Sequence, residues 1–162
     1  MNLTVTTAAG SATATVTLVD QNPAFVVLGG GKHVGGVIVR TDGSGAYGNG
    51  TYDIIGPAGT SLGYATVPAK AGDAVLLFGA GFGPTNPPVL AGQAFAGAAP
   101  ATDSISITIN GQTVIPSFAG LSAPGLYQFN LTIPAGLGTG DQPLAATANT
   151  APTQPGVVIA LQ

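Results

Sequence analysis

Apolar and polar residues alternate in short runs along this sequence, and a glycine or proline ends almost every run. The run SISITIN (104–110) places isoleucine at every second position and leads into Asn110–Gly111, a dipeptide typical of a tight hairpin turn. The run LYQFNLTIP (126–134) follows the same rule. Such period-two alternation is typical of strands with one buried face. The predicted inward-facing side chains are Ile105, Ile107, Ile109, Tyr127, Phe129, Leu131 and Ile133.

Roughly ten such runs, at the spacing typical of sandwiches, predict strands, and no segment shows the 3.6-residue period of a helix. We therefore predict an all-β fold: an immunoglobulin-like β-sandwich with an N-terminal β-hairpin or strand extension. The extension covers residues 1–66, in which 1–19 form an edge or donor hairpin and 20–66 a loop-rich β segment. The compact sandwich covers residues 67–162, and all six aspartates are expected at turns or strand starts.

The composition argues against several classes of protein. Only 6% of the 162 residues are charged and the net charge is −3, so nucleic acid is not an expected partner. Hydrophobic residues make up 45% of the chain, which separates it from disordered sequences despite 26 glycines and 13 prolines. No run reaches the roughly 18 apolar residues of a membrane span. Without cysteine or glutamate, and with few lysines, the chain is expected at a bacterial surface or outside the cell.

The stretch GAGFGPTNPP (79–88) invites comparison with a phosphate-binding glycine loop. That kind of loop works by opening a helix whose free N–H groups point at the anion. The three prolines supply no N–H group and push each preceding residue toward extended geometry, so no helix is expected here. We predict instead a strand that turns a corner, with Gly81 in or beside the strand and no anion bound.

The sequence offers little that could carry out catalysis or hold a metal. His33 is the only histidine, and no serine lies in a nucleophile elbow, because Ser44 belongs to the turn sequence DGSGA. Asp42 in the same turn is a weak candidate ligand for calcium, which needs several converging oxygens. We therefore expect no enzyme activity, no cofactor and no metal.

Several stretches together resemble a known family. GAGFGPTNPP is followed by FAGL (118–121), GLYQFNLTIPAG (125–136) and GDQPL (140–144), and this order resembles the Solibacter-type C-terminal domain family. With NPAFVVLGGG (22–31) leading in, the resemblance covers residues 20–162. It implies an immunoglobulin-like module at the end of a large secreted or surface-anchored bacterial protein. The family has no assigned activity, so the resemblance implies no catalytic residues.

The N-terminal segment is the main candidate for assembly. Residues 2–19 carry no charge, and residues 12–19 alternate as a strand, so an exposed edge here would recruit another strand. The partner is either another part of this chain or a neighbouring copy that accepts the segment as a donor strand. The candidate donor-strand residues are Leu3, Val5, Val16 and Leu18.

Two functions remain open at this point. The first is a non-enzymatic extracellular structural protein that forms a homo-oligomer or polymer, either as a filament subunit or as a module of a larger surface protein. The alternative is an adhesion module that binds glycan or another surface protein through the loops of residues 40–66. Its candidate binding residues are Tyr47, Tyr52 and Tyr64, which would otherwise cover the edge of the core.

Overall fold

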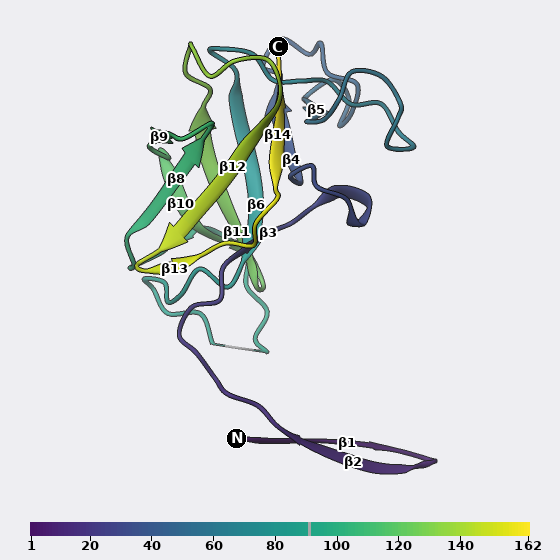
Figure 1. Cartoon of the computed structure of the whole chain (residues 1–162), viewed down its shortest axis with the longest axis vertical. Coiled ribbons are helices and arrows are strands. Elements are labelled where there is room, and N and C mark those ends of the chain that lie inside the picture. The colour runs from purple at the N-terminus through teal and green to yellow at the C-terminus, as the bar shows by residue number, and fades with distance from the viewer. Residues whose placement is uncertain (91) are drawn as a thin grey trace.

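The structure is a computed structural model that describes residues 1–90 and 92–162. The described chain is all-β, as predicted, and consists of a two-stranded hairpin, a seven-stranded sheet and a five-stranded sheet (Figure 1). Every strand pair in these sheets is antiparallel. Within the described residues, no helix has the length and apolar character that a membrane crossing needs.

The elements have the following bounds. The hairpin contains β1 (Asn2–Thr7) and β2 (Gly10–Thr15). The seven-stranded sheet has the order β5 (Tyr52–Ile54), β4 (Gly36–Val39), β6 (Ala74–Ala80), β11 (Leu126–Thr132), β10 (Phe118–Ala123) and β7 (Ala99–Pro100), with β3 (Ala24–Phe25) beside β6. The five-stranded sheet has the order β13 (Ala151–Pro152), β12 (Gly140–Ala148), β8 (Ile105–Ile109) and β9 (Gln112–Val114), with β14 (Val158–Leu161) beside β12. A single 3-10 turn, η1 (Leu28–Gly30), completes the described elements.

The two larger sheets face each other and enclose one hydrophobic core (Figure 1). Phe129 of β11 and Leu77 of β6 enter it from one sheet, while Ile107 and Ile109 of β8 enter from the other, and all four are fully buried. The predicted inward faces are therefore confirmed, except that Ile105 is half-buried and packs against the rim of the core. This arrangement follows from the alternation, since each strand can turn only one face inward.

Two predicted turns are also confirmed. Asn110 and Gly111 have positive φ angles of 50° and 76°, and they connect β8 to β9 with Ile109 opposite Gln112. In GAGFGPTNPP, β6 ends at Ala80, and Gly81 follows it with a φ of 76°. A Cβ atom on Gly81 would lie 2.2 Å from the carbonyl oxygen of Asn22, so glycine lets the two backbones cross closely here.

The segment between residues 20 and 66 is part of the sandwich. Strand β4 lies between β5 and β6 in the seven-stranded sheet, and β3 pairs with the other end of β6. The Val34 N–H group donates to the Val158 carbonyl, which joins this segment to the five-stranded sheet as well. The expected division near residue 67 therefore falls inside one hydrogen-bonded structure, because strands far apart in sequence supply its neighbours.

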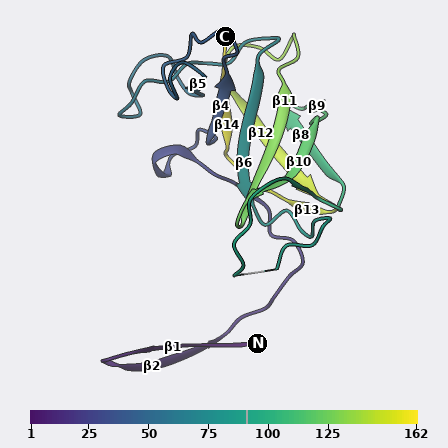
Figure 2. The ribbon, with the colours of Figure 1, turned by 180° about the vertical axis from the view of Figure 1, so that it is seen from behind.

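The N-terminal hairpin projects away from the sandwich (Figures 1 and 2). Its two strands pair only with each other, and every residue in them is exposed. The strand expected over residues 12–19 ends earlier, at Thr15, because Val16 pairs with Met1 at the base of the hairpin and nothing continues the ladder. Leu18 therefore lies outside the hairpin, in the segment that connects it to the sandwich.

Candidate functional site

The two faces of the hairpin differ in polarity. Side chains of residues directly opposite each other in a hairpin share a face, so the register fixes the members of each face. On one face the hydroxyl oxygens of Thr4 and Thr13 lie 2.9 Å apart and form a hydrogen bond, and those of Thr6 and Ser11 lie 2.8 Å apart. Thr15 donates to the Asn2 side chain on the same face. These polar side chains thus satisfy one another across the strands.

The opposite face of the hairpin is apolar and uncovered. We call it the apolar face; it consists of Met1, Leu3, Val5, Ala12, Ala14 and Val16. Leu3 is 51% exposed and Val5 is 57% exposed, and only Val16 is half-buried. Three of the four predicted donor-strand residues, Leu3, Val5 and Val16, therefore share one surface, whereas Leu18 lies apart from it.

Both outer edges of the hairpin are open. The Met1 and Val16 main chains exchange two hydrogen bonds, so the bonded pairs alternate from there toward the tip. The main-chain groups of the intervening residues point outward from each strand, and no described strand lies beside them. These residues are Asn2, Thr4, Thr6, Ser11, Thr13 and Thr15. Neither edge carries a charge or a proline that would block the addition of another strand.

A charged cluster that sequence reasoning missed joins three strands of the sandwich. The Arg40 Nε atom donates to Asp53 at 2.7 Å, and its Nη1 atom donates to Asp73 at 3.2 Å. Burial raises the pKa of Asp53, but hydrogen bonds from the Ala46 N–H group and from Arg40 outweigh it and leave the pKa lowered. The cluster fastens β4, β5 and β6 together, and each of its carboxylate oxygens accepts a hydrogen bond.

The aspartates were predicted at turns or strand starts, and the structure corrects part of that prediction. Asp42 does form a turn, since it accepts hydrogen bonds from the N–H and hydroxyl groups of Ser44. Asp53 lies instead inside β5, and Asp141 lies inside β12. Each of these carboxylates pairs with a cation: Asp53 with Arg40 beside the neighbouring strand, and Asp141 with Lys32 from a distant part of the chain.

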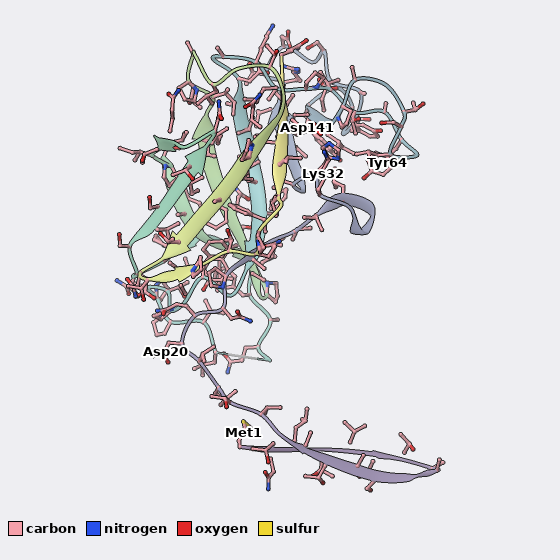
Figure 3. All side chains as sticks on the ribbon, viewed as in Figure 1. Met1, Asp20, Lys32, Tyr64 and Asp141 are labelled. Atoms are coloured by element: carbon pink, nitrogen blue, oxygen red, sulfur yellow. The ribbon has the colours of Figure 1, made fainter. Side chains whose placement is uncertain are left out.

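Asp141 forms a second cluster, at the edge of β12. Lys32 Nζ lies 2.8 Å from one carboxylate oxygen, and His33 Nε2 lies 3.1 Å from the other (Figure 3). The hydrogen bond from Lys32 lowers the pKa of Asp141 against the effect of burial, and His33 lowers it further. His33 also forms a parallel bridge with Val158 of β14, so the cluster fastens the loop of residues 32–34 to the sheet.

The structure brings two of the three predicted surface tyrosines together. The rings of Tyr47 and Tyr52 stack with their centroids 5.9 Å apart, and the Tyr47 hydroxyl donates to the Ala65 carbonyl. Tyr64 precedes that residue and lies in the loop at the margin of the sandwich (Figure 3). All three side chains are half-buried, so they cover the edge of the sheet and still offer ring surface to solvent.

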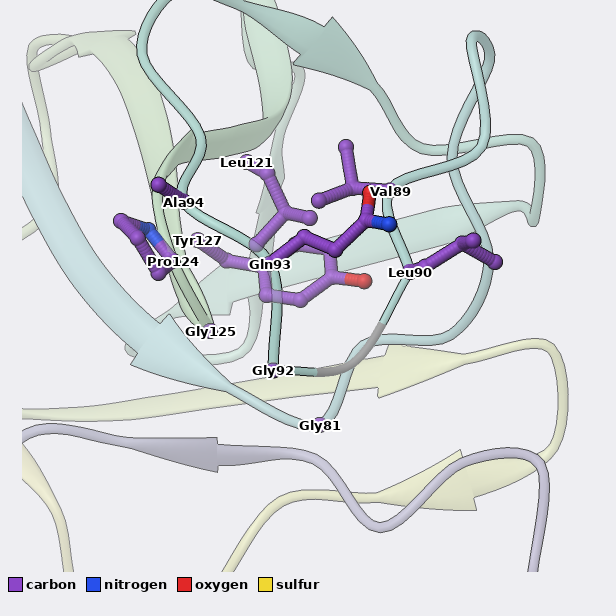
Figure 4. Close-up of a pocket in the computed structure, with 10 residues that line it drawn as sticks. All are labelled: Gly81, Val89, Leu90, Gly92, Gln93, Ala94, Leu121, Pro124, Gly125 and Tyr127. Carbon is purple, nitrogen blue, oxygen red and sulfur yellow. The ribbon is translucent and has the colours of Figure 1, made fainter.

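A cavity of about 570 Å³ opens at the end of β6, beside the turn between β10 and β11 (Figure 4). Its wall is largely apolar and includes Val89, Leu121 and Pro124. The Tyr127 hydroxyl donates to the Gly83 carbonyl, and burial, with a smaller effect of Asp103, raises its pKa. Tyr127 therefore stays protonated at neutral pH and acts as a structural hydrogen-bond donor.

The described residues contain no group of three or more histidine, cysteine, aspartate or glutamate side chains placed to hold a metal ion. The charged groups of both clusters are paired with one another, and the cavity wall is largely apolar. The hairpin is thus the most distinctive surface of the molecule. No protein-family model, no curated protein and no solved structure matches the chain.

Proposed function

We propose that this chain is a non-enzymatic structural module of a bacterial surface or secreted protein, and that it joins neighbouring copies through its N-terminal hairpin. The observation that carries the proposal is the uncovered hairpin, with an apolar face and two open edges. An isolated two-stranded hairpin is marginally stable in water, and its exposed apolar side chains would be removed from water by a partner. The hairpin therefore gains stability when a partner covers it.

The open edges favour a repeating assembly. Addition of a strand to one edge of the hairpin leaves its other edge free, so this contact does not close on itself. Repetition of such contacts produces a filament. When the module belongs to a larger surface protein, the same contacts would hold neighbouring molecules side by side.

Composition and resemblance support the extracellular location. A chain in which only 6% of the residues are charged is poorly protected against association, because charge is what keeps monomers apart. The resemblance of residues 20–162 to the Solibacter-type C-terminal domain family favours a secreted or surface-anchored protein. The immunoglobulin-like class of the sandwich, which that resemblance implies, stays a prediction.

Electron microscopy and analytical ultracentrifugation of the purified chain test the proposal. We expect ordered oligomers or polymers whose abundance rises with concentration. A variant that lacks residues 1–19 is expected to be a folded monomer, because the first core residue in the chain is Phe25. Compact monomers at every concentration, or polymers unchanged by the deletion, would contradict the proposal.

A second candidate function is adhesion through the tyrosine loops. The observation that favours it is the stacked pair of Tyr47, in a glycine-rich loop, and Tyr52, at the start of β5, since stacked rings with nearby polar groups suit the face of a sugar. Glycan-array binding by the intact chain, lost in Tyr47→Ala and retained in Thr4→Ser, would support this function. If the intact chain binds no glycan, this second candidate function is excluded.

A further inference from the structure

We infer that the apolar face of the hairpin packs against the same face of a second copy, with β1 of each copy lying over β2 of the other. This inference rests on the proposed assembly through the hairpin and specifies its geometry. The two hairpins would form two layers about 10 Å apart, as sheets do in a sandwich. Their outer edges stay open, so the pair can still grow by strand addition.

The absence of charge lets identical faces meet. Residues 2–19 contain no ionisable side chain, and the N-terminal ammonium of Met1 donates to the Val16 carbonyl at the base of the hairpin. Contact between two copies of the face therefore brings no charged side chains together, and each Met1 ammonium group stays at the base, bonded to its own Val16 carbonyl. The polar side chains lie on the opposite face, where they already bond one another, except Thr7 at the tip, whose hydroxyl donates to the Gly10 carbonyl, so the contact leaves none of them without a partner.

The shape of the face indicates how the copies align. Strand β1 carries the larger residues and β2 the smaller ones, since Leu3 lies opposite Ala14 and Val5 lies opposite Ala12. A hollow of about 270 Å³ lies beside Val5, above the small residues Gly10 and Ala12. A two-fold axis parallel to the strands places the larger row of each copy over the smaller row of the other. The side chains at the tip of one hairpin then fill the hollow of its partner.

The small size of the face sets the strength of the contact. The face extends over about six residues of each strand, at a rise of about 3.3 Å per residue, and the two strands lie about 4.8 Å apart. It therefore covers about 200 Å² per copy. Stable interfaces bury a total of about 1,200 to 2,000 Å². The contact is therefore weak between free copies, and it becomes effective at high concentration or where copies are already held close together. The experiments accordingly need protein concentrations up to the millimolar range.

Sedimentation equilibrium of the full chain tests which face of the hairpin makes the contact between copies. In the double variant Leu3→Thr and Val5→Thr, the β-branched side chains preserve the strand, but the face loses its larger apolar groups. We expect its dissociation constant to rise by about tenfold or more, since two aliphatic side chains are no longer buried. The matched control, Thr4→Ser with Thr6→Ser on the polar face, is expected to associate like the original chain.

Cross-linking tests the alignment, and the absence of cysteine makes single-cysteine variants clean probes. Thr7 lies near the tip on the apolar side, opposite Gly10. With the axis parallel to the strands, the two tips lie together, so Thr7→Cys copies should be joined by a short bismaleimide. Thr6→Cys, on the other face, should not be joined. If the two hairpins pointed in opposite directions, the rise per residue would place the two Thr7 positions about 20 Å apart, and no cross-linked product would form.

The outcomes separate the inference from the proposed function. If the chain associates and the Leu3 and Val5 double variant associates equally well, the face is wrong but assembly through the hairpin stands. If Thr7→Cys gives no product in associated chains, the alignment is wrong. If the chain without residues 1–19 associates as well as the full chain, the proposed function itself fails. Weak association that the double variant loses and Thr7→Cys traps supports the inference.

Discussion

The sandwich and the N-terminal hairpin use the same alternating pattern, yet their apolar side chains lie in opposite environments. Phe129 in β11 is fully buried between two sheets, whereas Leu3 in β1 is 51% exposed. Both lie in strands with every second residue apolar. The comparison teaches that alternation determines which side chains share a face, while the presence of a second layer determines whether that face is buried.

The largest expected effect comes from emptying the core. Phe129→Ala should lower the free energy of unfolding by about 3 to 5 kcal/mol, because it removes a fully buried ring and leaves a cavity. Chemical denaturation measures the change. Leu3→Ala is the control in the hairpin, and in dilute solution it should change the free energy by no more than about 0.5 kcal/mol. Equal effects of the two substitutions would erase the contrast between the regions.

The next effect comes from the charged cluster inside the seven-stranded sheet. Arg40→Met should cost about 3 kcal/mol at neutral pH, because it leaves the carboxylates of Asp53 and Asp73 without their cation. Lys70→Met is the control, since it removes the same charge from an exposed position. Thermal denaturation of both variants measures the difference, and similar melting temperatures would show that the cluster contributes little.

The Arg40→Met variant also tests how the stability of the chain depends on pH. The folded-state pKa of Asp53 is lowered, so its stabilising contribution is present above the unfolded carboxyl pKa of about 3.9. That contribution is lost as the pH falls through the lowered folded-state pKa. The stability difference between the original chain and Arg40→Met should therefore shrink in acid. A difference that stays constant from pH 7 down to pH 2 would contradict this account.

A smaller effect is expected where the connecting segment joins the sandwich. Gly81 and Gly111 both have a φ of 76°, but a Cβ atom would meet the Asn22 carbonyl at Gly81 and nothing within 4 Å at Gly111. Gly111→Ala should cost about 1 kcal/mol from backbone strain alone, and Gly81→Ala should cost up to about 3 kcal/mol. If urea denaturation shows the same loss of unfolding free energy for both variants, the close approach of Asn22 does not affect stability.

The smallest effect is expected from removing the hairpin. Deletion of residues 1–19 should leave the free energy of unfolding of the sandwich unchanged within about 0.5 kcal/mol, since none of these residues belongs to the core. Denaturation at low protein concentration isolates this effect from assembly. A large loss would mean that the hairpin packs against the sandwich in solution, and it would abolish the distinction between the two regions.

Much of the fold could be predicted from local sequence. The alternation over residues 104–110 and 126–134 predicted β8 and β11 and, apart from Ile105, their inward faces, and Asn110–Gly111 predicted the tight turn between β8 and β9. The glycine-rich stretch after residue 79 was correctly predicted as a corner. These predictions succeeded because turn residues and period-two patterns act over a few positions.

The candidate site could be predicted only in part. The lack of charge in residues 2–19 indicated a segment that pairs with another strand, but not that Leu3 and Val5 would share an uncovered face with Ala12 and Ala14. Part of the signal for the charged cluster was present, because Arg40 directly follows a buried strand and Asp73 directly precedes another. The pairing itself depends on the order of the strands, which no nearby residue specifies.

The sequence by itself determined which residues form strands, which side chains share a face and where the chain turns. Each of these depends on backbone geometry and on neighbours a few residues away. Only the tertiary structure decided that β3 and β4 join β6 in one sheet, and that Lys32 meets Asp141. It also decided that the core covers β11 and leaves the hairpin bare. Those outcomes depend on hydrogen bonds and contacts between distant segments, whose partners are fixed by the packing of the whole chain.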